Sequence, residues 1–277
     1  KVDFGLKTLR DVSYGNHERH KLDVYFPNGN SSSLPAVIYF HGGGYINGDK
    51  TAIRDGLKED ILEAGIVFIS CNYRFITETP FPAPMNDATR AIQFVRYKAK
   101  EWNIDPERIA LSGGSAGAHM SLWNAFKGDL AKPDSADPVE RESSSVCAAV
   151  VFESQISKDQ HFYKQHYLGE KIQPNIALFY GIKDVKELES PEIRQLSYEA
   201  SAINYLTAQA PPVLTSYSQP FTEPIIPADA GDIVHHPIHG YLLKKQMDEL
   251  GIRCVFRHGL DPQREGEVVQ FLLDAFQ

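Results

Sequence analysis

A glycine-rich turn in the middle of the chain has the residue types of a nucleophilic site. Residues 113–117 read GGSAG, and they lie between the apolar run RIALS and the helical pattern AHMSLWNAF. This order of strand, tight turn and helix is the context that the pattern G-x-S-x-G requires. Glycines on either side let a serine project from a strained turn without collisions, and the helix that follows aims its first amides at developing negative charge. We therefore predict that Ser115 is a nucleophile.

A second glycine run, His41-Gly42-Gly43-Gly44, directly follows the apolar stretch AVIYF. Three consecutive glycines cost backbone entropy, so a folded chain uses them where backbone amides must approach a ligand closely. We predict that Gly43 and Gly44, together with Ala116 after the serine, donate amides to an oxyanion formed at Ser115. His41 is expected to brace the loop by hydrogen bonding. The alternative is an ordinary glycine turn after a strand.

The two glycine motifs and the segment between them resemble a known family. HGGG, then YRF and PFPAPMNDATRAIQFVRYKAKEWNIDPERIALSGGSAGAH, are similar to the α/β-hydrolase serine esterases grouped with hormone-sensitive lipase. The elbow GGSAGAH looks closer to the bacterial acetyl-xylan and feruloyl esterase branch. The resemblance is specific from about Leu34 to Leu122. It implies a mixed eight-stranded sheet, a Ser-Asp/Glu-His triad in that chain order, and no cofactor.

The acid of such a triad is expected in the loop after the strand PPVLTSY. There the sequence E-P-I-I-P resembles the family's D-P-x-x-P, with about two residues inserted before it, and this match predicts Glu223 as the acid. A carboxylate of either length can orient an imidazole. Asp229 and Asp232 lie in the same loop and are alternatives. A third interpretation is that all three are solvated loop carboxylates.

The base is expected to be a histidine in the loop after the last strand. Of ten histidines, His258 meets this condition, because it ends the run RCVFRH. The alternatives are His235, His236 and His239 in the segment HHPIH, or no functional base. Three imidazoles so close together could also bind zinc. Pro237 interrupts the helical register that would align them, so we predict loop packing there and no metal site.

Short apolar runs alternate with amphipathic segments along the chain, which predicts an α/β fold with a mostly parallel sheet covered by helices on both faces. One domain over residues 1–277 is expected, with insertions at 155–200 and 218–237 that line the site. An edge strand is expected at 21–27. Further strands are predicted at 36–40, 66–70, 108–112, 148–154, 211–217 and 253–258, and helices at 52–64, 86–101, 117–127, 238–250 and 263–276.

The composition excludes several classes of protein. The chain has 277 residues and a formal charge of −8, from 28 basic and 36 acidic side chains. Without clustered cations, nucleic acid is not an expected partner. No apolar run approaches the ~20 residues of a membrane-spanning helix. The three cysteines lie in strand-like runs and are expected to be free thiols. The sequence is compatible with a cytoplasmic protein and with an exported one whose signal has been removed, and with any oligomeric state.

These features together predict a serine carboxylesterase that works through an acyl-enzyme. Only 40 residues precede HGGG, which leaves little room for an N-terminal cap and favours short acyl or aryl esters. Acetyl or feruloyl groups on carbohydrate are among the expected substrates. Two other interpretations stay open. One is an amidase, formamidase or peptidase on the same fold, and the other is a non-catalytic binding member.

Overall fold

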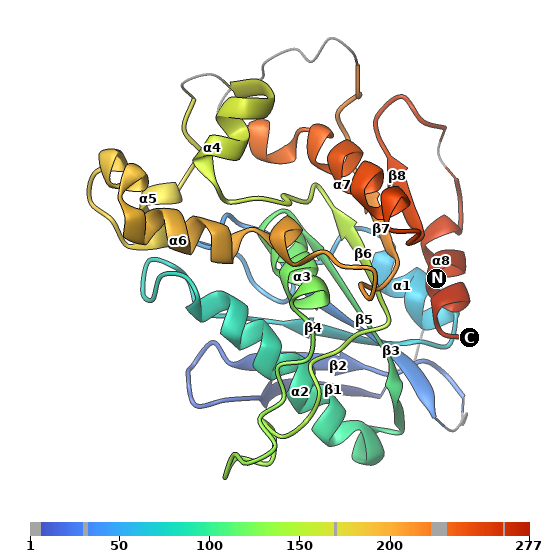
Figure 1. Ribbon diagram of the computed structural model, residues 1–277. Coiled ribbons are helices and arrows are strands. Elements are labelled where there is room, and N and C mark those ends of the chain that lie inside the picture. Colours follow the sequence, from blue (N-terminus) through green and yellow to red (C-terminus); the bar gives the residue numbers. More distant parts are fainter. Residues whose placement is uncertain (1–6, 30–32, 169–170, 223–231, 263) are drawn as a thin grey trace.

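A single mixed sheet organises the computed structural model of the protein, which describes residues 7–29, 33–168, 171–222, 232–262 and 264–277 (Figure 1). Its strand order is β1-β2-β4-β3-β5-β6-β7-β8. β2 pairs antiparallel with both β1 and β4, and the other neighbours pair in parallel. The predicted α/β class and mostly parallel sheet are confirmed. The strands are β1 Thr8–Ser13, β2 Lys21–Tyr25, β3 Leu34–Phe40, β4 Val67–Cys71, β5 Ile104–Gly114, β6 Ala148–Phe152, β7 Val213–Ser216 and β8 Cys254–Arg257.

Helices cover both faces of this sheet because its central strands are apolar on both sides. In β3, Val37 and Tyr39 belong to the core under α1 and α8, whereas Ile38 and Phe40 belong to the core under α2 and α3. Figure 1 shows α1 and α8 together on one side of the strands and α2 and α3 on the other. The helices are α1 Leu57–Glu63, α2 Ala83–Trp102, α3 Ala116–Lys127, α4 Gln160–Tyr163, α5 Ile176–Tyr180, α6 Pro191–Ala200, α7 Ile238–Glu249 and α8 Glu267–Ala275.

The helical periodicity in the sequence corresponds to real buried faces. In α2 the predicted apolar stripe is buried against the sheet, and the helix ends at Asn103, which takes the left-handed backbone conformation. The stripe consists of Ala88, Ala91, Ile92, Val95 and Ala99. All five predicted helices are present in the described residues, with shifted boundaries. The strand expected at the sheet edge, β2, is flanked on its outer side by β1, which was absent from the sequence predictions because three of its six residues are half-buried and three are exposed.

The stretch 155–200 departs from the strand-helix alternation, as expected. It contains α4, α5 and α6, which follow the end of β6 and lie on the upper side of the molecule in Figure 1. The stretch 218–237 contains the short 3-10 helix Ile233–His235 just before α7. Residues 223–231 lie outside the described part. The single-domain organisation stays a prediction.

The two glycine motifs meet at the carboxyl edge of the sheet because β3 and β5 are parallel neighbours. Phe40, the last residue of β3, pairs with Gly113 of β5. A Cβ atom added to Gly117 would lie 1.9 Å from the Phe40 carbonyl oxygen, and one added to Gly113 would lie 2.5 Å from Gly117. The first turn of α3 thus touches the backbone of β3, which only glycine permits.

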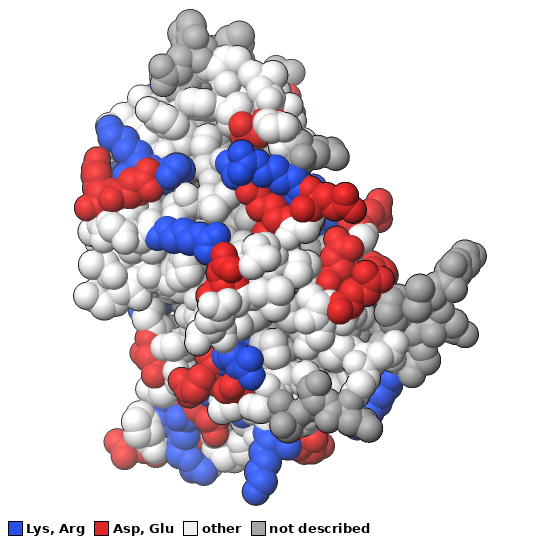
Figure 2. Space-filling view, turned by 90° about the vertical axis from the view of Figure 1, so that its right-hand side faces the viewer, with Lys and Arg blue, Asp and Glu red and all other residues white. Residues whose placement is uncertain are grey.

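Charge on the surface is mixed. Figure 2 shows acidic and basic side chains beside one another on the face that carries α8. Ion pairs such as Arg253–Asp274 (3.0 Å) and Arg257–Glu267 (2.6 Å) lie between β8 and α8. Among the described residues, no helix is long and apolar enough to cross a membrane. The three cysteines are free thiols, as predicted.

The contact between α3 and β3 predicts that alanine substitutions at two nearby glycines change the free energy of unfolding by different amounts. Gly117→Ala should lower the free energy of unfolding by about 3 kcal/mol or more, because its methyl group has no space beside Phe40. Gly114→Ala is the matched control, since its Cβ would lie 3.8 Å from the Tyr39 hydroxyl, an ordinary contact. Urea denaturation of both variants measures the difference. Equal stabilities would contradict the packing described here.

Candidate active site

Ser115 occupies a strained turn between β5 and α3. Its φ of 51° and ψ of −112° lie outside the regions that non-glycine residues normally adopt. Strain of this kind persists when surrounding contacts impose it, and here the Ser115 N–H donates to the Phe152 carbonyl of β6 at 2.9 Å. The side chain is left facing His235, whose Nε2 lies 2.8 Å from Ser115 Oγ. This hydrogen bond joins a hydroxyl to an imidazole nitrogen.

Three backbone amides in the two glycine motifs have no acceptor among the described residues. Gly42 lies against Ser115, since a Cβ at Gly42 would be 3.5 Å from that of the serine. Gly43 and Gly44 have φ values of 114° and 60°, which glycine adopts readily. Ala116 is the first residue of α3. Within the described part of the chain, the N–H groups of Gly43, Gly44 and Ala116 donate to no protein atom. They are therefore available to an oxyanion.

His41 is part of the scaffold of this glycine loop. Its ring stacks on Tyr73 with centroids 4.4 Å apart, and the Tyr73 hydroxyl donates to the His41 carbonyl at 2.7 Å. Arg19 can only donate, so His41 Nε2 accepts from its Nη2 and His41 Nδ1 donates to the Gly42 carbonyl. Burial lowers the pKa of His41 to about 4, which keeps the ring neutral. A neutral ring can perform both hydrogen-bonding roles at once.

A second pair, Tyr45 and His119, ties the glycine loop to α3. The Tyr45 hydroxyl lies 2.6 Å from His119 Nδ1 and 2.8 Å from the Ala116 carbonyl. His119 Nε2 donates to the Ala200 carbonyl at 2.8 Å. Burial holds the pKa of His119 well below its usual value, so this ring is also neutral. The sequence analysis did not single out either residue, although both directly follow the two glycine motifs.

The segment HHPIH places its three histidines in three different settings. His235, in the 3-10 helix, faces Ser115. His236 Nδ1 accepts the Ile238 N–H at 3.1 Å, at the start of α7. His239 Nδ1 accepts the Ile156 N–H, and its Nε2 donates to the Ile233 carbonyl, both at 3.3 Å. His239 therefore holds the turn that carries His235. In the described residues we find no group of three ligating side chains that could hold a metal ion.

The electrostatic setting of His235 favours its neutral form. Burial lowers its pKa, the carboxylates of Glu153 and Asp232 raise it, and Lys158 lowers it. Lys158 is itself buried, and burial lowers its pKa to about 7. Its Nζ donates to Gln155 Oε1 at 2.8 Å and lies 5.3 Å from the Phe179 ring centroid. No sequence motif marks Lys158.

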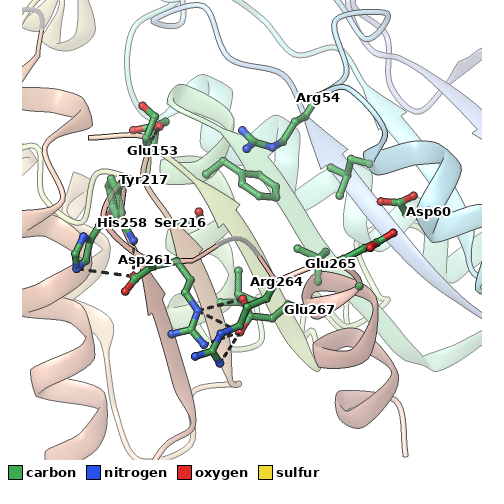
Figure 3. Close-up of a pocket in the computed structure, with 18 of the residues that line it drawn as sticks. Arg54, Asp60, Glu153, Ser216, Tyr217, His258, Asp261, Arg264, Glu265 and Glu267 are labelled. Carbon is green, nitrogen blue, oxygen red and sulfur yellow. Dashed lines mark hydrogen bonds and ion pairs between the residues drawn. The ribbon is translucent and has the colours of Figure 1, made fainter. Parts of the chain in front are cut away.

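His258, the histidine favoured by the sequence, lies at a different site. Its Nδ1 accepts the N–H groups of Phe221 and Leu260, and its Nε2 lies 3.8 Å from Asp261 Oδ2. The ring lines a cavity of about 880 Å³ at the ends of β6, β7 and β8 (Figure 3). In the described structure the hydrogen bond to Ser115 comes from His235 and not from His258. The geometry thus favours His235, one of the alternatives in HHPIH, over His258 as the partner of Ser115, because the short turn after β8 directs His258 to Asp261.

The predicted acid cannot be placed in the same way. Glu223 and its alternative Asp229 lie outside the described residues. Asp232 is described and exposed, and its carbonyl accepts the His235 N–H at 3.1 Å. Glu153, which the sequence analysis did not consider, acts on His235 together with Asp232.

The charges around His235 predict how its ring titrates. The pKa of His235, followed by NMR, should lie below the ordinary value of about 6.5. Lys158→Met should raise it, because the substitution removes a cation that disfavours the imidazolium. Lys127→Met is the control, because Lys127, at the end of α3, is not among the groups that act on His235. Its ammonium group lies over the rings of Trp123 and Tyr205. A pKa above 6.5 in the unmodified protein, or one that Lys158→Met leaves unchanged, would contradict this account.

Two curated relatives match two fifths to a half of the chain. Carboxylesterase NlhH of Mycobacterium tuberculosis is 34% identical over 112 residues, which are 40% of this chain and 35% of that protein. A probable isoprenylcysteine alpha-carbonyl methylesterase of Arabidopsis thaliana, ICMEL1, is 31% identical over 139 residues, 50% of this chain and 29% of that protein. The chain thus spans about a third of the length of these relatives.

Solved structures match nearly the whole chain and confirm the expected α/β-hydrolase fold. A truncated carbohydrate esterase from gut microbiota superposes with a TM-score of 0.75 and 22% identity, covering 97% of this chain and 96% of that one. A bacterial heroin esterase superposes with a TM-score of 0.67 and 19% identity, covering 99% and 84%. The family model described as BD-FAE matches residues 22–235. The chain therefore belongs to the BD-FAE family.

Proposed function

We propose that this protein hydrolyses carboxylic esters with Ser115 as nucleophile and His235 as base. The observation that carries the proposal is the 2.8 Å hydrogen bond between Ser115 Oγ and His235 Nε2 at a strained turn. Three amides of the glycine motifs, which donate to no atom of the described residues, are available beside it. A hydroxyl, a neutral imidazole and preorganised amide donors are the groups that acyl transfer requires. Two of the named relatives are esterases, which supports the same reaction.

The geometry supports a two-step reaction through an acyl-enzyme. Ser115 Oγ attacks the acyl carbon while His235 Nε2 takes its proton, and the carbonyl oxygen becomes an oxyanion. The N–H groups of Gly43, Gly44 and Ala116 stabilise that charge, and one such donor is worth about 3 kcal/mol. The C–O bond to the alcohol then breaks, and His235 gives its proton to the leaving oxygen. Water, activated by the same ring, hydrolyses the acyl-enzyme and restores Ser115.

A small acyl group fits the surroundings of the glycine loop best. A Cβ at Gly44 would lie 3.0 Å from Asn175 Nδ2, so the segment before α5 closes directly over the loop. Phe179 of α5 lies against Tyr45, with ring centroids 5.5 Å apart. We propose short-chain acyl esters as substrates, including acetyl groups on carbohydrate. The fold shared with a carbohydrate esterase supports this choice.

Substitutions at three residues test the assignment. Ser115→Ala and His235→Ala should each lower kcat for p-nitrophenyl acetate by about 10⁴-fold or more, because attack requires both groups. His258→Ala should keep near-normal kcat, since His258 interacts with Asp261 and not with Ser115. Steady-state kinetics with folded variants give the answer. Loss of activity in His258→Ala with retention in His235→Ala would reverse the assignment of the base.

The same assay separates the other interpretations from the proposal. An amidase or peptidase would turn over p-nitroanilides better than matching p-nitrophenyl esters, whereas the proposal expects the esters to react faster. A fluorophosphonate probe should label Ser115 in the folded protein, and mass spectrometry locates the adduct. Failure of the folded protein to react would favour a non-catalytic member of the family.

The closed glycine loop predicts a preference for short acyl chains. Acetyl and butyryl esters should have kcat/KM values at least about tenfold above those of esters with ten or more acyl carbons, because longer chains meet Asn175 and α5. A series of p-nitrophenyl esters measures this preference. If decanoyl esters react as fast as acetyl esters, residues 155–200 bind long acyl chains and do not exclude them.

A further inference from the structure

Glu153 follows directly after β6, at the strand end that holds the turn of Ser115. Its predecessor Phe152 accepts the Ser115 N–H, and the Glu153 N–H donates to the Ser216 carbonyl of β7 at 2.8 Å. Glu153 has a φ of 54°, in the left-handed region that costs a non-glycine residue about 1–2 kcal/mol. A conformation that is costly at a strand end next to the nucleophile marks Glu153 as a residue with a role there.

The Glu153 carboxylate has one oxygen engaged and one unused. Oε1 accepts the Ser218 N–H at 2.7 Å, which fixes the side chain beside β7. Oε2 is buried and, among the described residues, has no hydrogen-bond partner. Figure 3 shows Glu153 at one rim of the large cavity, apart from the pair formed by His258 and Asp261. A buried carboxylate oxygen that accepts nothing is rare in folded proteins, and such an atom is expected to have a function.

His235 has a hydrogen-bond donor that lacks an acceptor among the described residues. Its Nε2 lies at Ser115 Oγ, so in the reactive tautomer the ring proton is on Nδ1. Within the described part of the chain, no protein atom accepts a hydrogen bond from His235 Nδ1. Among the described residues, Glu153 is the acidic group that acts most strongly on the ring, ahead of Asp232. The ring therefore lies in the field of a carboxylate that has a free, buried oxygen.

From these observations we propose that Glu153 is the positioning residue for His235, and that its Oε2 accepts the Nδ1 proton when the imidazole becomes charged. This inference rests on the proposed function of Ser115 and His235. Hydrogen bonds at a reacting site often tighten only when substrate is bound, and the imidazolium attracts the carboxylate more strongly than the neutral ring does. The predicted acid Glu223 would then have no part in the reaction.

The decisive variant is Glu153→Gln, because glutamine keeps an oxygen for the Ser218 N–H and removes the charge. Its kcat for p-nitrophenyl acetate should fall about 10²-fold or more, with KM nearly unchanged. The acid limb of kcat/KM should move to lower pH, because the imidazolium loses a carboxylate that raises the pKa of His235. Asp232 and Lys158, the other charged groups that act on His235, are unchanged in this variant. A merely structural role would not move the pH profile.

Matched variants make the test specific. Glu265→Gln removes another glutamate that lines the same cavity and should keep normal kcat and pH profile. Glu153→Asp keeps the charge, so its acid limb should stay near that of the unmodified protein even if kcat falls. The proposal is overturned if Glu153→Asp shifts the limb as Glu153→Gln does, or if Glu153→Gln is silent while Glu223→Gln or Asp232→Asn abolishes activity. Full activity in Ser115→Ala would instead reject the proposed function itself.

Discussion

The close approach of α3 to the end of β3 is the constraint on which the site depends. Gly117 touches the Phe40 carbonyl where no Cβ could fit, and this contact places the first turn of α3 against the glycine loop. Ser115, in the turn between β5 and α3, is consequently held at a φ of 51°, and its N–H donates to the Phe152 carbonyl. The strained conformation of Ser115 is maintained by these contacts, and it directs the serine hydroxyl out of the carboxyl edge of the sheet. Everything else at the site is built around that direction.

Neutral histidines hold the surrounding loops in place. His41, His119 and His239 are all fully buried, and burial lowers the pKa of each. A neutral imidazole donates from one nitrogen and accepts at the other, so each ring can join two hydrogen-bonding groups at once. His41 does this for the glycine loop and His239 for the turn of His235. His235 shares the lowered pKa but remains directed at Ser115, and it is the ring whose proton can move.

The sequence predicted the parts of the site that depend on local backbone geometry. A serine between glycines and a run of three glycines need particular turns after strands, and the pairing of Phe40 with Gly113 brings these turns together. The base could not be found in this way, because His235 lies 120 residues from Ser115 and its approach depends on how the loop before α7 folds back. The expectation that the base follows the last strand pointed to His258, but the turn after β8 is short and leaves that ring beside Asp261. Glu153 was missed because it stands at the end of an apolar strand without any motif.

A crystal structure of the Ser115 adduct with a short alkyl phosphonate tests the central claim most directly. The adduct imitates the tetrahedral intermediate, so its atoms show which groups serve the oxyanion and which ring faces the nucleophile. This account predicts the phosphonyl oxygen within hydrogen-bond distance of the amides of Gly43, Gly44 and Ala116, with His235 Nε2 beside Ser115 Oγ. An adduct in which His258 faces Ser115 Oγ, or in which the phosphonyl oxygen points away from the glycine loop, would contradict it.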